Sequence, residues 1–132
     1  MSFTLNILLV AMVQGAMAFG QTQPVGPHDG FVRTAANFRT EVLALGAGRI
    51  KVYLLDESLK NPVVQQSSVS AWIHRGSARK PFACKPEPDH FICELTLGSK
   101  MKVGDSLRLK TERLGTQGKL VVYKLPLTVG TP

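Results

Sequence analysis

The stretch "NFRTEVLALGAGRIKVYLLD", Asn37 to Asp56, decides the fold class of this 132-residue chain. Two runs rich in apolar and β-branched residues, 37–45 and 49–56, flank the short segment "GAG" at Gly46 to Gly48. Because glycine adopts positive φ angles at little cost, a tight reversal of the chain belongs at this segment. We therefore expect an antiparallel hairpin with strands over 37–45 and 49–56.

The alternation of apolar and polar residues continues along the rest of the chain. In "SVSAWIH", for example, Val69, Ala71 and Ile73 share one face of a strand, and Trp72 and His74 lie on the other. About seven or eight short strands follow one another, with a turn signal roughly every eight to twelve residues. This pattern predicts an all-β, single-domain antiparallel β-sandwich of the immunoglobulin-like type, with a five-stranded OB-type barrel as the alternative.

The first thirty residues resemble a processed export signal. An apolar run at 7–13 is followed by "AMA" at 16–18, the small-x-small pattern that signal peptidase accepts. The run is shorter than the ~20 apolar residues that a membrane anchor needs, so we expect no transmembrane segment after cleavage. The predicted organisation is a signal peptide at 1–18, a flexible lead-in at 19–30, a β domain at 31–128 and a tail at 129–132. The predicted location is periplasmic or secreted.

The only two cysteines are Cys84 and Cys93, in "CKPEPDHFIC". They flank a proline-rich turn, and hairpin geometry can place them opposite each other, where an oxidising compartment favours a disulfide. A zinc site needs four ligands, whereas Cys84, His90 and Cys93 supply three at most. A redox centre would favour Cys-x-x-Cys. We predict a disulfide, with an unpaired buried pair or a metal site as alternatives.

The chain is basic, with 16 Lys and Arg against 9 Asp and Glu and a net charge of +7. All charged residues follow residue 28, so this charge belongs to the predicted mature protein. Such a balance favours anionic partners, although it also serves solubility. The predicted polyanion-binding residues are Arg75, Arg79, Lys80, Lys100 and Lys102. The expected partner is an envelope protein or an anionic polymer.

Nucleic acid is a poorer candidate for the partner. Single-stranded nucleic acid binds to exposed aromatic side chains interleaved with cations, and here only Trp72 has a phase that would expose it. A tryptophan buried in a sandwich core is the favoured alternative, and export from the cytoplasm also argues against nucleic acid. Lysines and arginines near the strand ends discourage edge-to-edge pairing, so we expect a monomer.

Signatures of common enzymes are missing from the sequence. It contains no G-x-S-x-G elbow, no H-E-x-x-H motif and no phosphate-binding loop. The segment "GAGRIK" fails the dinucleotide pattern because Lys51 stands in the place of its last glycine. We therefore predict an exported, non-enzymatic binding or accessory protein without a resident cofactor.

A weak transition-metal site is the sharper hypothesis. His28, His74 and His90 fall at predicted strand ends or junctions, and imidazole together with a carboxylate such as Glu41 suits Cu(II) or Zn(II). If His74 and His90 lie on neighbouring strands, they can meet. The simpler interpretation is that the three histidines are unrelated surface residues.

The run "GPHDGFV…NFRTEVLALGAGRIKVYLLDESLKNPV" resembles small exported bacterial proteins with an immunoglobulin-like sandwich, often found with heavy-metal efflux systems. Those proteins tend to open with His-Gly-Gly, followed by an aromatic-x-x-Glu strand and a strand of the type V-x-L-Y-V-x-D before a Lys-Pro turn. The matching positions are His28, Gly30, Phe38, Glu41, Ile50 to Asp56 and Lys60 to Pro62. Here Asp29 replaces the first glycine of the pair. The resemblance covers roughly residues 26 to 64 and implies that His28 and Glu41 are associated with a metal.

Overall fold

The computed structural model describes residues 25–96 and 99–127 of the chain. The strands in this part are β1 (Phe31–Thr34), β2 (Phe38–Gly46), β3 (Arg49–Asp56), β4 (Ser68–Arg75), β5 (Ala78–Pro86), β6 (Phe91–Leu95), β7 (Ser106–Arg113), β8 (Thr116–Gln117) and β9 (Val121–Lys124). Within the described residues, no helix is long and apolar enough to cross a membrane. The predicted signal peptide 1–18, residues 19–24 of the predicted lead-in and the predicted tail 129–132 lie outside the described residues.

Strands β2 and β3 form the hairpin that the sequence predicts. Residues 38–44 pair in register with 50–56, and the register shifts at a bulge before Gly46. The turn residues Gly46, Ala47 and Gly48 all have positive φ angles, of 83°, 53° and 74°. Because only glycine adopts such angles without a steric penalty, the two glycines lower the steric cost of this tight reversal.

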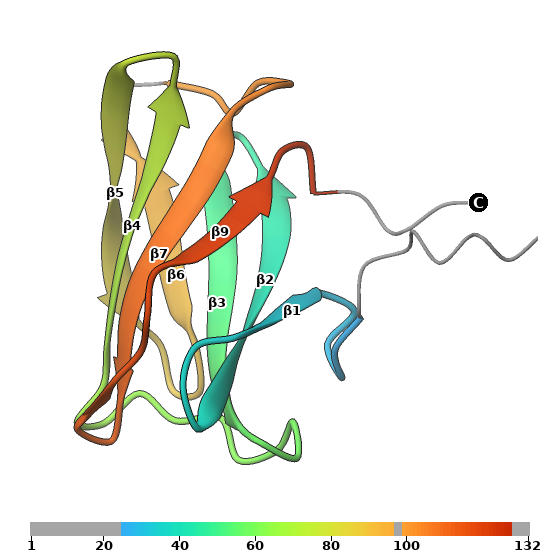
Figure 1. Cartoon of the computed structure of the whole chain (residues 1–132), viewed down its shortest axis with the longest axis vertical. Coiled ribbons are helices and arrows are strands. Elements are labelled where there is room, and N and C mark those ends of the chain that lie inside the picture. The colour runs from blue at the N-terminus through green and yellow to red at the C-terminus, as the bar shows by residue number, and fades with distance from the viewer. Residues whose placement is uncertain (1–24, 97–98, 128–132) are drawn as a thin grey trace, which may run out of the picture.

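One continuous antiparallel sheet contains all the strands, and β5 joins its two halves. The first part of β5, Ala78–Pro81, pairs with β4, and the second part, Phe82–Pro86, pairs with β6. The strand order is β1-β2-β3-β6-β5-β4-β7-β8, and β9 also pairs with β7. In Figure 1, β4, β7 and β9 form the front of the molecule, and β6, β3 and β2 lie behind them.

The two ends of this sheet approach each other. The backbone N–H of Lys119 donates to the carbonyl oxygen of Ala35 at 2.8 Å. The hydroxyl of Tyr123 in β9 donates to the carbonyl oxygen of Phe31 in β1 at 3.1 Å. The sheet is therefore nearly closed into a barrel. The prediction of an all-β antiparallel fold is confirmed. The structure nevertheless shows one barrel-like sheet, where two separate sheets were expected. The nine strands of the described residues also exceed the five strands of an OB-type barrel, the predicted alternative.

The space inside the sheet is filled by side chains that alternate along the strands. Fully buried members of this core include Phe38, Val42, Ile50, Val52, Leu54, Ile73, Leu107, Leu109 and Tyr123. Each large apolar side chain contributes roughly 1.5–3 kcal/mol through its burial. The Tyr123 hydroxyl lies 2.8 Å from Oγ1 of Thr40, and burial raises the pKa of Tyr123. Val121 and Leu125 are buried in the same core as Tyr123.

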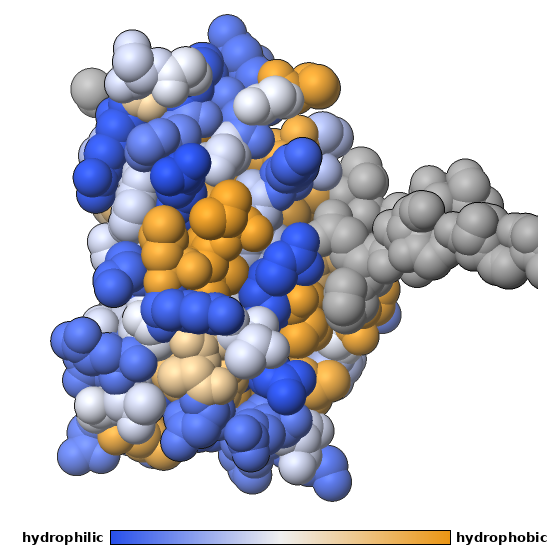
Figure 2. Space-filling model, in the orientation of Figure 1, coloured by the Kyte–Doolittle hydropathy of each residue, from blue (hydrophilic) through white to orange (hydrophobic). Residues whose placement is uncertain are grey.

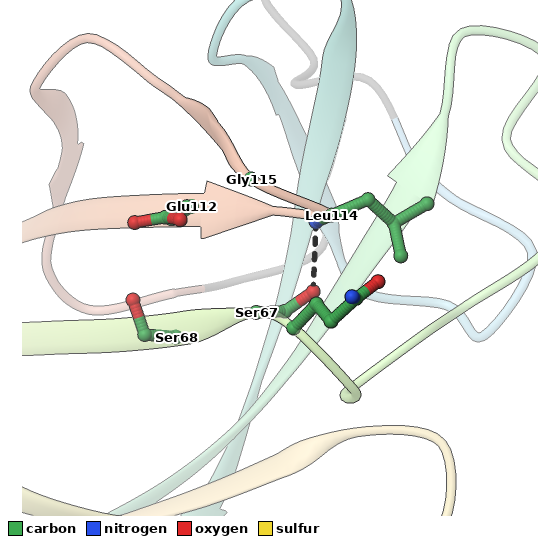
Figure 3. Close-up of a pocket in the computed structure, with 6 residues that line it drawn as sticks. Ser67, Ser68, Glu112, Leu114 and Gly115 are labelled. Atoms are coloured by element: carbon green, nitrogen blue, oxygen red, sulfur yellow. Dashed lines mark hydrogen bonds between the residues drawn. The ribbon is translucent and has the colours of Figure 1, made fainter.

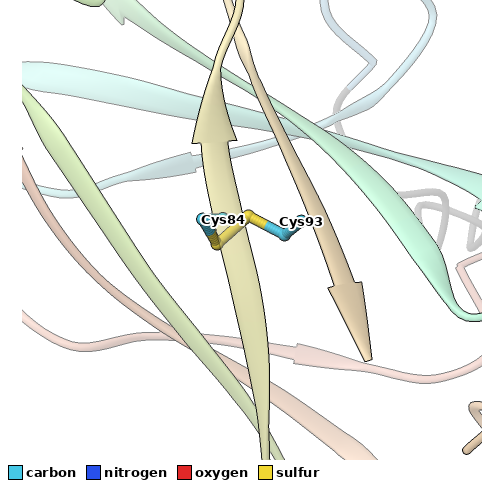
Figure 4. Close-up of a disulfide and its surroundings, with 2 residues drawn as sticks. All are labelled: Cys84 and Cys93. Carbon is cyan, nitrogen blue, oxygen red and sulfur yellow. A yellow bond between two sulfur atoms is a disulfide. The ribbon is translucent and has the colours of Figure 1, made fainter. Parts of the chain in front are cut away.

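Cys84 in β5 and Cys93 in β6 face each other in the register and form the predicted disulfide (Figure 4). Their Cα atoms are 3.9 Å apart, and Cys93 is fully buried. The bond fastens the second part of β5 to β6, directly after β5 has left β4. Since such bonds persist in oxidising compartments, the disulfide points to a location outside the cytoplasm.

Residues 25–30, "VGPHDG", fold back onto the sheet. Val25 forms an isolated bridge with Phe31, and the N–H of Gly26 donates to the carbonyl oxygen of Gly30 at 2.8 Å. Through these contacts residues 25–30, the last part of the predicted lead-in, form a compact turn. The turn holds His28 against β2 and β3.

Candidate functional site

The carboxylate of Glu41 is fully buried beneath the turn of residues 25–30. It accepts hydrogen bonds from the backbone N–H groups of His28 and Gly30, each at 2.8 Å. Its other oxygen lies 2.8 Å from Nδ1 of His28. A buried carboxylate needs such compensation, because burial removes its hydration. Glu41 therefore holds the turn in place, and the two residues that the resemblance singles out are in direct contact.

Two glycines allow the turn to approach this carboxylate. A Cβ atom added to Gly26 would lie 2.5 Å from Cδ of Glu41. A Cβ atom added to Gly30 would lie 2.7 Å from the carbonyl oxygen of Val42. No larger residue fits at either position without displacement. The sequence signal for this arrangement is the spacing of Gly26 and Gly30 around His28, but nothing in the local sequence links these glycines to Glu41.

His28, Tyr53 and His90 form an aromatic row on the outside of β2, β3 and β6. The rings of His28 and Tyr53 are stacked, with centroids 3.7 Å apart and an angle of 4° between the planes. The rings of Tyr53 and His90 are 5.3 Å apart and tilted by 47°. Burial, followed by the charges of Asp89 and Glu41, raises the pKa of Tyr53. Nδ1 of His90 lies 2.7 Å from Asp89, so both imidazoles face a carboxylate through Nδ1.

His74 does not join this row. It lies on β4, opposite Arg79 of β5 and Ser106 of β7, in the other half of the sheet. The structure thus brings His28 and Glu41 together and places His90 against Tyr53. It separates His74 from the other three predicted metal ligands. In the described part of the chain, no group of three or more His, Cys, Asp or Glu side chains is arranged to hold a metal ion.

The predicted basic cluster around β4 and β5 is divided by the alternation of strand faces. Arg75 points to the inner end of the sheet, where its guanidinium donates to both oxygens of Asp105 at 2.8 Å. It also donates to the carbonyl oxygen of Lys100 at 2.7 Å, and the N–H of Lys102 donates to Asp105 at 2.7 Å. The hydrogen bonds from Arg75 lower the pKa of Asp105. The guanidinium of Arg75 is therefore already hydrogen-bonded within the fold.

The other basic residues of that cluster lie on different faces. Lys80 pairs with Ile73, a core residue, and so points to the inner side of the sheet. Arg79 points outward, and its guanidinium carbon lies 4.1 Å from the centre of the Trp72 ring. Of the five predicted polyanion-binding residues, Arg75, Lys100 and Lys102 meet around Asp105, whereas Arg79 belongs to the outer surface.

The strand register assembles a larger basic surface on the outside of β5, β4, β7 and β9. One row across these strands contains Arg79, His74, Ser106 and Lys124, and the next contains Pro81, Trp72, Arg108 and Val122. Lys110 lies opposite Ser70 in a third row. We call Arg79, Arg108, Lys110 and Lys124 the outer basic face. The alternation of residues along β7 and β9 turns Arg108, Lys110 and Lys124 outward, but only the strand order places them beside Arg79.

Charge is distributed unevenly between the two halves of the sheet. Residues 64–82 and 99–127 hold ten of the 16 cationic side chains and only two of the nine acidic ones, Asp105 and Glu112. Residues 25–63 and 83–96 hold six cationic and seven acidic side chains, so their charges nearly cancel. The net charge of +7 therefore comes from the half that contains β4, β7 and β9. Figure 2 views this half from outside and shows hydrophilic side chains around a hydrophobic area in its middle.

A shallow polar hollow of about 360 Å³ lies at the far end of β4 and β7 (Figure 3). Its lining consists of Gln66, Ser67, Ser68, Glu112, Leu114 and Gly115. The hydroxyl of Ser67 accepts a hydrogen bond from the N–H of Leu114 at 3.0 Å and donates to the carbonyl oxygen of Gln65 at 2.9 Å. Both hydrogen bonds of the Ser67 hydroxyl fix the loop, so this serine has a structural role.

Comparison with known proteins adds no assignment, because no family, no curated protein and no solved structure matches the chain.

Proposed function

We propose that this chain is an exported, non-enzymatic binding protein that holds an anionic polymer or an acidic partner of the cell envelope on its outer basic face. The observation that carries the proposal is the concentration of positive charge on one half of the sheet. The single acidic residue of that half outside the Arg75–Asp105 pair is Glu112. A surface of one sign attracts ligands of the other sign over about a Debye length, roughly 8–10 Å in physiological salt.

The spacing of the outer basic face suits an extended ligand. Neighbouring strands lie about 4.8 Å apart, and alternate residues of one strand lie about 6–7 Å apart. Arg79 and Lys124 therefore lie in one row across the strands, Arg108 in the next row and Lys110 in the third. A polymer with regularly spaced anionic groups can contact several of these cations at once, which compensates for the weakness of each exposed contact.

Two further assignments belong to the same proposal. The disulfide and the predicted signal peptide together support a periplasmic or secreted location. The finer fold class, an immunoglobulin-like sandwich, is supported by the change of partner within β5, which divides the strands into a β1-β2-β3-β6 layer and a β4-β7-β9 layer.

The test is retention of the protein on an anionic matrix at increasing salt. The variant Arg108→Gln/Lys110→Gln/Lys124→Gln removes three charges from the outer basic face. The matched control, Lys51→Gln/Lys60→Gln/Lys85→Gln, removes three charges from the other half. We expect the face variant to elute at lower salt and the salt dependence of its binding to fall by about 2–3 in log–log slope. Equal losses in both variants would show that net charge alone governs retention, and the proposal would fail.

A second candidate function is the weak binding of Cu(II) or Zn(II) at His28. One observation favours it: Nδ1 of His28 faces the buried carboxylate of Glu41 at 2.8 Å, the arrangement that orients many metal-binding histidines and leaves Nε2 for the ion. Calorimetric titration with each ion tests this, with His74→Ala as the control for His28→Ala. Submillimolar binding that His28→Ala abolishes and His74→Ala preserves would support the candidate. Equal binding by both variants would exclude it.

A further inference from the structure

Trp72 occupies an unusual position on the outer basic face. It is the only tryptophan of the chain, and it lies on the outside of β4, because its neighbours Ala71 and Ile73 face the core. It is nevertheless only 8% exposed. Its cross-strand neighbours are Pro81 and Arg108. Trp72 is thus buried, as predicted, but it lies on the outer side of the sheet and not in the core where that burial was expected.

The indole N–H of Trp72 has no hydrogen-bond partner among residues 25–96 and 99–127. Nε1 is buried, and none of the described residues accepts a hydrogen bond from it. Buried donors are almost always paired in folded proteins, since an unpaired donor loses its bond to water without replacement. An unpaired donor on the outside of a sheet, on a ring covered by the exposed side chain of Arg79, indicates a place that a ligand acceptor can fill.

The guanidinium of Arg79 covers the Trp72 ring. Its guanidinium lies 4.1 Å from the ring centre, and the side chain is exposed. Within residues 25–96 and 99–127, no ion pair or hydrogen bond ties this guanidinium to another group. An exposed cation–π contact is worth less than the pairing of a buried donor with a charged acceptor. An anionic group that draws Arg79 off the ring therefore gains more than the contact it breaks.

We propose that Trp72, Arg79 and Arg108 form a subsite for one oxyanion group, a phosphate, sulfate or carboxylate. This inference rests on the proposed function, because the group is a substituent of the anionic polymer held by the outer basic face. The guanidinium of Arg79 pairs with two oxygens of the group, and the indole N–H of Trp72 donates to one of them. Arg108, the cross-strand neighbour of Trp72, adds the second positive charge.

The same geometry argues against base stacking as the role of Trp72. Stacking of a nucleic-acid base requires an exposed ring face, whereas the Trp72 ring is 8% exposed and lies beneath Arg79. The outer basic face contains no second aromatic ring among its rows, apart from the imidazole of His74. Recognition of an anionic group by donors and charge fits these residues better than recognition of a base.

The indole N–H of the only tryptophan gives one nitrogen–proton NMR signal, which reports directly on the subsite. The probes are sodium sulfate, sodium phosphate and glucuronate, each compared with sodium chloride at equal ionic strength. We expect a saturable downfield shift of the indole signal with the oxyanions and none with chloride. Arg79→Gln should weaken the apparent affinity at least tenfold, and Lys85→Gln, on the other half of the sheet, should leave it unchanged.

A second variant separates the hydrogen bond from the charge. Trp72→Phe keeps an aromatic ring beneath Arg79 but removes the donor, and calorimetry should show at least tenfold weaker binding of the same oxyanions. Retention on the anionic matrix is measured on the same preparations. Retention without any oxyanion-specific shift would overturn the subsite and leave the proposed function intact. Loss of both retention and shift would overturn the proposed function as well. A shift that Arg79→Gln leaves unchanged would also overturn the subsite.

Discussion

The buried carboxylate of Glu41 allows a sharp prediction about stability. Replacement by alanine, Glu41→Ala, leaves the N–H groups of His28 and Gly30 without their acceptor. Each unpaired buried donor costs about 1–3 kcal/mol. Part of this cost is offset, because the variant no longer buries a charge. We expect a net loss of about 3–5 kcal/mol, the range typical of breaking one side of a buried polar pair.

This loss is large compared with the ~5–15 kcal/mol by which small domains are stable. It corresponds to a fall in melting temperature of at least about 12 °C for a domain of this size. Urea unfolding followed by circular dichroism gives the free energy of unfolding directly. Glu41→Gln, which keeps the volume and one acceptor oxygen, should lose about half as much as Glu41→Ala.

The matched control is Glu94→Ala. Glu94 is an exposed carboxylate on β6, opposite Arg49 of β3 in the register. Exposed pairs of this kind contribute about 0–1 kcal/mol, so the control should unfold almost like the native protein. If Glu41→Ala lies within 1 kcal/mol of Glu94→Ala, the argument that Glu41 holds the turn of residues 25–30 is wrong.

Three further predictions concern other contacts. Replacing both Cys84 and Cys93 by serine should lower the free energy of unfolding by about 2–3 kcal/mol, because the disulfide closes a short loop in the unfolded chain; equal stability of the native protein with and without reductant would contradict this. The pKa of Asp105 is lowered, chiefly by hydrogen bonds from Arg75, so its contribution to stability is present above about pH 4 and is lost as the pH falls through the lowered pKa. Unfolding between about pH 4 and pH 2 should therefore depend less on pH in Asp105→Asn, and an unchanged dependence would refute the assignment. Tyr123→Phe should cost about 1–2 kcal/mol in a thermal melt, because it removes the hydroxyl that joins β9 to β1, and a loss below about 0.5 kcal/mol would argue against this contact.

The strand pattern is the part of the structure that could be predicted most fully. The bounds of β3 agree with the predicted run 49–56, since a run of this composition between glycines and a polar turn has few alternatives. The Cys84–Cys93 pairing could also be predicted from the sequence, because a proline-rich turn fixes which residues of the flanking strands face each other. Both features depend on residues that are close together in the chain.

The candidate sites could be predicted from the sequence only in part. The inward or outward phase of Arg108, Lys110 and Lys124 follows from alternation, yet their position beside Arg79 depends on β4 pairing with β7, and β7 with β9. Likewise, the contact of His28 with Glu41 depends on the turn of residues 25–30 folding onto β2. Neither arrangement produces a repeating pattern in the local sequence from which it could be predicted.

The sequence by itself determined the all-β class, the hairpin at Gly46 to Gly48 and the disulfide, because periodicity and turn chemistry act over a few residues. Only the tertiary structure decided that β5 changes partner at Phe82 and that the ends of the sheet meet through Tyr123. It also decided that positive charge collects around Trp72, on the outside of one half of the sheet. These features are pairings between distant segments, and their free energy comes from burying a shared core that no single strand specifies.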